Sequence, residues 1–164
     1  MSVPTLRRPT AAPRWWVAAL VLVWVPLVLL AHRTATPARQ DLLGLGTWVI
    51  LVALLVRQEQ LVRAQTAVVV LFASAVEYTF SGWLHVYVYR LHDVPPFVPP
   101  GHGRVYRAAL SIGGTELLRR HARPAVVASV VGGGLYALWG LSPWAPRPDV
   151  LGAFWFACLL GFLA

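Results

Sequence analysis

The sequence predicts an all-α protein, a polytopic transmembrane helix bundle with five or six spans. Of its 164 residues, 58% are hydrophobic and only 12% are charged, roughly half the charged fraction of an average soluble domain. The mean hydropathy is +0.64. The apolar residues fall in runs of about 15–20, near the length at which a helix crosses a bilayer, and arginines flank most of these runs.

The strong positive charge indicates a lipid partner. Fourteen arginines face six acidic residues, which gives a net charge of +8. Most of these arginines flank apolar runs, where cations anchor helix ends to headgroups. They form no basic stripe with a helix that could read a nucleic acid. We therefore expect the lipid bilayer as a partner and no nucleic acid.

The first half of the chain predicts three spans, at residues 15–31, 42–56 and 66–84. A polar tail over residues 1–14 precedes them. The basic start and the apolar run after it resemble a secretory signal, but Pro26 and the later spans favour an uncleaved first helix. We assign residues 15–164 to a single transmembrane domain of a multi-pass protein of the cell membrane.

The second half predicts a rigid loop and two or three further spans. Four prolines in six residues make residues 90–104 a partly polyproline loop. Residues 105–118 have a helical pattern but are short and charged, so they form an interfacial or re-entrant helix or a thin span. The runs at 124–141 and 150–164 are spans. Three consecutive glycines at 132–134 favour close helix packing and allow a homo-oligomer.

Glu77 is the most informative residue, because a carboxylate inside a span must be paired, protonated or turned toward a polar cavity. Ser81 and His85 follow at i+4 and i+8, within about 80° of Glu77 on an ideal helix, which predicts one polar stripe. Tyr87 would lie about 80° away on the other side. Tyr87 therefore becomes a candidate for the wall of the same cavity, whereas Tyr89 fits the belt of aromatic residues at a membrane interface.

Three further polar residues extend this group toward the proline loop. His92 and Asp93 are neighbours, and His102 stands between two glycines that let its imidazole approach another surface. With Glu77 and His85 they are candidate metal ligands or proton-transfer groups at one membrane face. The histidine spacing matches no established zinc or di-iron motif. A metal-free cavity, a bound metal and purely structural hydrogen bonding all stay open, and the cofactor is unknown.

Arginines near the loop are candidates for ligand binding. An anionic headgroup is the commonest partner of arginines at a membrane interface, and the suitable residues are Arg104, Arg107, Arg119 and Arg120. We assign catalytic roles to Glu77, His85 and His102, and substrate binding to Tyr87, Tyr89 and Arg104. No metal ligand is assigned.

The stretch from Glu77 to Gly103 resembles a family of uncharacterised actinobacterial membrane proteins, through its acid, Tyr87-x-Tyr89 and the Pro-Pro-Phe-Val-Pro-Pro-Gly-His-Gly ladder. More loosely, the acid and the Tyr-x-Tyr near a helix end are similar to the carotenoid hydratase family, which acts on long isoprenoids. That resemblance implies that Glu77 exchanges a proton near a double bond while Tyr87 and Tyr89 line the substrate slot.

Three hypotheses follow. In the first, a polar Glu/His pocket at one membrane face acts on a lipophilic small molecule or isoprenoid by acid/base chemistry. In the second, the chain is a non-enzymatic membrane scaffold or transporter subunit in which Glu77 pairs with an Arg or His of another helix. The third is a metal-dependent enzyme.

Overall fold

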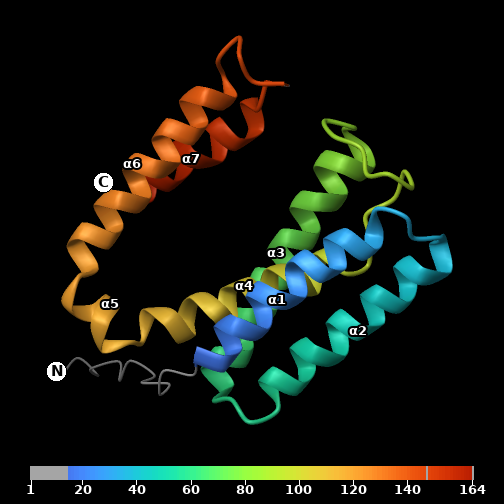
Figure 1. Ribbon diagram of the computed structural model, residues 1–164, viewed down its shortest axis with the longest axis horizontal. Coiled ribbons are helices and arrows are strands. Elements are labelled where there is room, and N and C mark those ends of the chain that lie inside the picture. Colours follow the sequence, from blue (N-terminus) through green and yellow to red (C-terminus); the bar gives the residue numbers. More distant parts are fainter. Residues whose placement is uncertain (1–14, 147, 164) are drawn as a thin grey trace, which may run out of the picture. The chain divides into compact units, whose positions relative to one another are not determined.

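The computed structural model describes residues 15–146 and 148–163, and most of these are helical (Figure 1). No strand occurs within this described part, so the predicted all-α fold class is confirmed. The predicted polar tail at 1–14 lies outside it. The elements are α1 (Trp15–His32), α2 (Pro37–Leu55), α3 (Gln60–Glu77), the π-helix η1 (Tyr78–Trp83), α4 (Val98–Gly113), α5 (Glu116–Arg120), α6 (Ala122–Gly140) and α7 (Val150–Leu163).

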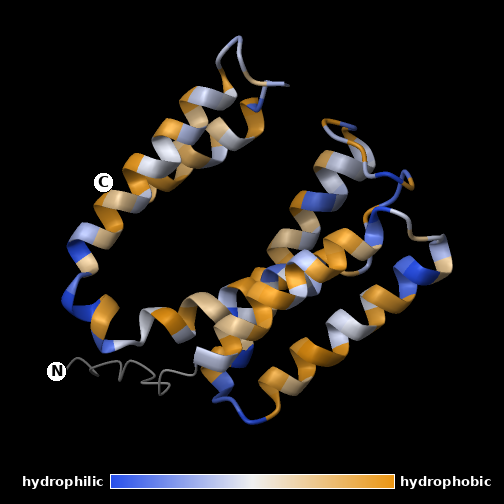
Figure 2. Ribbon diagram, viewed as in Figure 1, coloured by the Kyte–Doolittle hydropathy of each residue, from blue (hydrophilic) through white to orange (hydrophobic). Residues whose placement is uncertain are grey.

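Three helical segments are long and apolar enough to cross a bilayer. They are α1, α2 and the continuous segment formed by α3 and η1. Their apolar side chains lie mostly on the outside, as in Leu22 at 70% and Leu71 at 69% exposure, and Figure 2 shows the apolar colour along these helices. Outward apolar surface suits lipid and is unfavourable in water. The chain is a membrane protein. The shorter α7 is also apolar, and the total of five or six spans stays a prediction.

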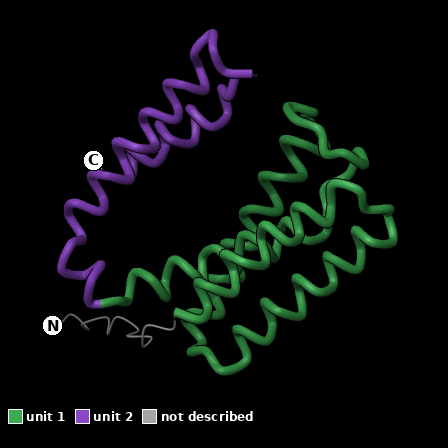
Figure 3. Tube along the Cα trace, viewed as in Figure 1, with its two compact units in different colours: residues 1–115 green, residues 116–164 purple. Residues whose placement is uncertain are grey.

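The described helices form two compact units (Figure 3). The first ends at Thr115 and contains α1 to α4 with η1, and the second begins at Glu116 and contains α5 to α7. The assignment of residues 15–164 to one transmembrane domain stays a prediction.

Helix α2 begins at Pro37, five residues before the predicted span at 42–56. Its N-cap is Thr36, whose hydroxyl accepts a hydrogen bond from the Arg39 N–H at 3.4 Å. Proline suits the next position because a helix leaves its first N–H groups unpaired in any case. Residues 37–41, which lie between the first two predicted spans, therefore belong to the start of the helix.

Helix α4 is the central helix of the first unit and packs against α1, α2 and α3. It begins at Val98, so the proline loop is shorter than the predicted 90–104, and Pro99 and Pro100 lie in its first turn. A Cβ on Gly103 would lie 2.7 Å from Val70 Cγ2. Glycine here lets α4 approach α3 closely. The helix ends at Gly113, so residues 105–118 do not form one continuous helix.

In the second unit, α6 and α7 pack against each other through the glycine run. A Cβ on Gly133 would lie 2.8 Å from Phe156 Cε2, whereas a Cβ on Gly132 meets nothing within 4 Å. The close packing expected at 132–134 is thus made by Gly133 and by Gly134, whose Cβ would stand 3.5 Å from the same ring.

This difference predicts opposite effects of two alanine substitutions. We expect Gly133→Ala to destabilise the α6–α7 pair by about 1 kcal/mol, because the Phe156 ring must move. Gly132→Ala should be neutral or stabilising by about 0.5–1 kcal/mol, since alanine is the better helix former. Thermal unfolding of both variants in neutral detergent measures the difference, and equal transition temperatures would contradict it.

Candidate functional site

Four side chains meet at the end of α3, and we call them the Glu77 cluster: Glu77, Tyr87, Tyr89 and His102. The Glu77 Oε2 atom accepts hydrogen bonds from the Tyr87 hydroxyl at 2.5 Å and the Tyr89 hydroxyl at 2.7 Å. The other carboxylate oxygen, Oε1, lies 4.0 Å from His102 Nε2. The Glu77 side chain is only 13% exposed. A mostly buried carboxylate is thus held by two donors and faces an imidazole.

The chain reaches this arrangement by leaving the α-helix directly after Glu77. In η1 the Leu84 N–H donates to the Thr79 carbonyl five residues back, at 2.8 Å. His85 then adopts φ +51°, which turns the chain into the loop at 84–97. The Tyr87 and Tyr89 rings lie edge to face with centroids 5.8 Å apart, a favoured aromatic geometry. The loop thereby returns both phenols to the carboxylate at its base.

Both phenols remain protonated at neutral pH. Burial raises the pKa of Tyr87 above its ordinary value of 10.0, and the hydrogen bond and negative charge of Glu77 raise it further. The same causes, with burial the largest, raise the pKa of Tyr89. Both side chains therefore act as hydrogen-bond donors that orient the carboxylate.

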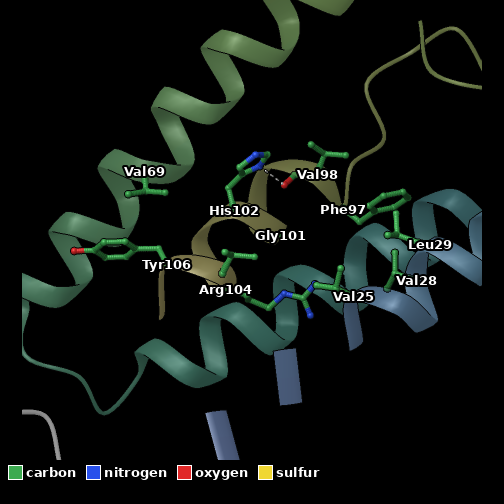
Figure 4. A pocket seen from close by; sticks show the side chains of 11 residues that line it. Val25, Val28, Leu29, Val69, Phe97, Val98, Gly101, His102, Arg104 and Tyr106 are labelled. Atoms are coloured by element: carbon green, nitrogen blue, oxygen red, sulfur yellow. Dashed lines mark hydrogen bonds between the residues drawn. The ribbon is translucent and has the colours of Figure 1, made fainter. Parts of the chain in front are cut away.

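His102 lies in the second turn of α4, with its Nδ1 atom 3.1 Å from the Val98 carbonyl oxygen (Figure 4). Because a carbonyl only accepts, Nδ1 carries the proton in this contact. In the neutral imidazole, Nε2 is then unprotonated and faces Glu77 across 4.0 Å. The His102 side chain is 47% exposed. Nε2 is therefore the ring nitrogen that can take a further hydrogen-bond partner.

A pocket of about 530 Å³ lies between α1, α3 and α4 (Figure 4). Its wall is largely aliphatic, with Val25, Val28 and Leu29 from α1 and Val69 from α3. Its polar side chains are His102, Arg104 and Tyr106. His102 therefore belongs both to the pocket and to the Glu77 cluster.

Arg104 lines this pocket but is only 2% exposed. Its guanidinium lies over the Trp24 ring, 5.5 Å from the centroid, within the range of a cation–π contact. Its Nε and Nη1 atoms are buried and find no acceptor among the described residues. Arg107 is also buried at 3%, whereas Arg119 and Arg120 are exposed on α5. The four arginines proposed for headgroup binding thus occupy two different environments.

His85 does not join the cluster. Its Nδ1 atom lies 3.1 Å from the Ser81 carbonyl oxygen, and its side chain is exposed. The predicted stripe assumed an α-helix, but η1 and the positive φ of His85 change the direction of its side chain. His92 is exposed and has φ +63°. Of the five polar groups that we expected to converge, the structure brings Glu77 and His102 together.

Metal ligands do not gather in the described part of the chain. Within it, no three His, Cys, Asp or Glu side chains are placed to hold a metal ion. Asp93, one of the candidates, instead accepts a hydrogen bond from Gln40 Nε2 at 3.2 Å.

Gln40 is an organising residue that sequence reasoning missed. It is 2% exposed, and its Oε1 lies 2.6 Å from His32 Nε2 while its amide donates to Asp93. Arg90 Nη2 also donates to the Ala35 carbonyl. These contacts fasten the loop at 84–97 to the ends of α1 and α2. Thr36-Pro37, a helix-start signature, was the available signal that Gln40 lies inside a helix.

No protein-family model, curated protein or solved structure matches the chain. The site therefore has to be interpreted from its own geometry.

Proposed function

We propose that this membrane protein binds a lipophilic small molecule in the pocket between α1, α3 and α4 and exchanges a proton with it through His102. The observation that carries the proposal is the double position of His102. It lines the largely aliphatic pocket and lies 4.0 Å from the buried carboxylate of Glu77. Apolar pockets with a few placed polar groups are the usual form of small-molecule sites.

The chemistry assigns one task to each group. Val98 fixes the Nδ1–H of His102, which leaves Nε2 as the atom that takes or gives the proton. When Nε2 is protonated, the nearby carboxylate of Glu77 stabilises the imidazolium. Tyr87 and Tyr89 position that carboxylate. His85 has no task in this mechanism, because its ring contacts the Ser81 carbonyl.

An isoprenoid is our candidate substrate, on the strength of the similarity to the carotenoid hydratase family. In that case His102, with Glu77 beside it, exchanges a proton near a double bond of the isoprenoid. We also propose that the protein is multi-pass and resides in the cell membrane, where such substrates dissolve.

Deuterium transfer tests the proposal without knowledge of the product. The purified protein is incubated in heavy water with isoprenoid lipids, and mass spectrometry follows deuterium in the extracted lipids. We expect incorporation with the wild type and a loss of about 10²–10⁴-fold in Glu77→Gln and in His102→Gln, the usual contribution of a general acid/base. His85→Gln is the matched control and should retain activity. Incorporation that Glu77→Gln leaves unchanged would sink the mechanism.

A non-enzymatic scaffold or transporter subunit is the second candidate. The observation in favour of this candidate is that Tyr87 and Tyr89 attach the loop at 84–97 to α3 through their hydrogen bonds with Glu77. Under this alternative, Glu77→Gln lowers the yield of folded protein or of a homo-oligomer in size-exclusion chromatography, and neither wild type nor variant transfers deuterium to a lipid.

A further inference from the structure

We infer that the ligand of this pocket is an amphiphile with an anionic head, a carboxylate or a phosphate, and that Arg104 binds that head. The inference rests on the pocket of the proposed function and names the class of molecule that fills it.

The first argument is the unbalanced charge of Arg104. A guanidinium keeps its proton in proteins, and burial of a cation without a partner is strongly unfavourable. Arg104 is 2% exposed, and its Nε and Nη1 atoms have no acceptor among the described residues. The Trp24 ring at 5.5 Å offers a cation–π contact but no acceptor in the guanidinium plane. The Arg104 guanidinium therefore has donors left for a hydrogen-bond acceptor that the described residues do not provide.

The second argument is that no acidic side chain in the described part of the chain pairs with this arginine. All six acidic residues lie in the described part of the chain, and within it no carboxylate comes within 4.0 Å of Arg104. Asp41 and Glu59 are exposed. The other four are engaged elsewhere, by hydrogen bonds or an ion pair: Glu77 with the two phenols, Asp93 with Gln40, Glu116 with Arg120 and Asp149 with the Gly152 N–H. On this inference the ligand supplies the counter-charge that the described residues lack.

The third argument is the shape and lining of the pocket. Its volume of about 530 Å³ falls in the range of pockets that enclose one small ligand. The aliphatic wall from α1 suits a hydrocarbon tail, and the planar fork of an arginine matches a carboxylate or phosphate with two parallel hydrogen bonds. Arg104 and His102 both line the pocket, and Figure 4 draws their side chains on different sides of the α4 backbone. The charged head and the site of proton exchange thus lie at separate places along the ligand.

Equilibrium binding of three matched probes tests this inference. The full-length protein in a neutral maltoside detergent is titrated with dodecanoate, dodecyl phosphate and dodecanol, which share a tail and differ in the head. We expect one or both anions to bind about 10–100-fold more tightly than the alcohol, the gain from charge-assisted hydrogen bonds. Acetate and inorganic phosphate, which lack the tail, should not compete at equal concentrations.

Variants of Arg104 test whether this residue causes the preference for the anionic probes. Arg104→Gln should remove the preference for the anion and leave dodecanol binding unchanged. Arg119→Gln changes an exposed arginine and should leave the preference intact. Arg104→Lys keeps the charge without the fork and should retain part of the preference, which provides a second variant where Arg104→Gln does not fold.

The outcomes separate this inference from the proposed function. Equal binding of dodecanol and both anions by the wild type would overturn the anionic head and leave a lipophilic pocket in place. A preference that persists in Arg104→Gln would overturn the role of Arg104. Failure of all three probes to bind would remove both the inference and the pocket on which the proposed function depends.

Discussion

Replacement of both Tyr87 and Tyr89 by phenylalanine is expected to lower the free energy of unfolding by about 2–4 kcal/mol. One hydrogen bond to a charged group contributes about 1.5–3 kcal/mol. The expected loss is less than twice the upper value because both phenols are only partly buried. The two hydroxyls are the donors that hold Glu77 Oε2, at 2.5 and 2.7 Å. Without them a carboxylate that is 13% exposed lacks its donors, and the loop loses its attachment to α3.

Unfolding by SDS titration in neutral detergent measures this effect. Tyr78→Phe is the matched control, since Tyr78 belongs to the same segment but is 56% exposed, and surface changes usually stay within about 0.5 kcal/mol. Equal stability of the control and the double variant would show that the hydroxyls contribute nothing.

The same cluster gives the stability a defined pH dependence. The pKa of each phenol is raised above its ordinary 10.0 in the folded chain. Above that pH the unfolded chain loses phenol protons that the folded chain keeps, so the contribution is complete below about pH 10 and declines as pH rises. The decline should be smaller in the double phenylalanine variant.

The Gly44→Ala substitution is expected to destabilise the first unit by about 1–3 kcal/mol, the usual cost of overpacking. A Cβ at this position would lie 2.6 Å from Pro96 Cγ and 2.7 Å from Pro96 Cβ, with the Pro96 backbone carbon at 3.1 Å. A proline ring has little freedom to move aside. The loop at 84–97 would have to shift away from α2.

Gly46→Ala, on the same helix, is the control. Its Cβ would meet Trp24 at 3.6 Å, an ordinary contact. Alanine should therefore be neutral or stabilising by about 0.5–1 kcal/mol. A comparison of the two unfolding midpoints decides the matter, and a stable Gly44→Ala protein would mean that α2 and the loop are not packed as described.

Hydrophobic runs were sufficient to predict helices close to those observed at both ends of the chain. The apolar run at 15–31 corresponds to α1 at 15–32, and the runs at 124–141 and 150–164 correspond to α6 at 122–140 and α7 at 150–163. In these segments the ends of the helix and of the apolar run lie within two residues of each other. In α2 they do not, because Thr36 caps the helix before the apolar run begins. Helix-capping preferences can predict a polar first turn, whereas a hydropathy profile cannot.

The sequence predicted those parts of the site that depend on the unfavourable burial of a charge or on residues close together in the chain. Glu77 stood out because a carboxylate inside a span is energetically unfavourable. Tyr87 and Tyr89, which are near it in the sequence, donate hydrogen bonds to it. The place of His85 depended on helical periodicity, which fails where the helix changes type. The contacts of Gln40 with His32 and Asp93 join three separate segments, and no local pattern reports such contacts.

The π-helix η1 makes this region sensitive to length in a way that its composition does not reveal. Its hydrogen bonds span five residues where an α-helix spans four, as in the bond from the Leu84 N–H to the Thr79 carbonyl. Deletion of a single residue between 78 and 83 would allow the ordinary helical repeat to continue and would rotate everything after it. Conservative substitutions in this segment should therefore be tolerated far better than insertions or deletions. The number of residues, more than their identity, determines the direction in which the loop returns to Glu77.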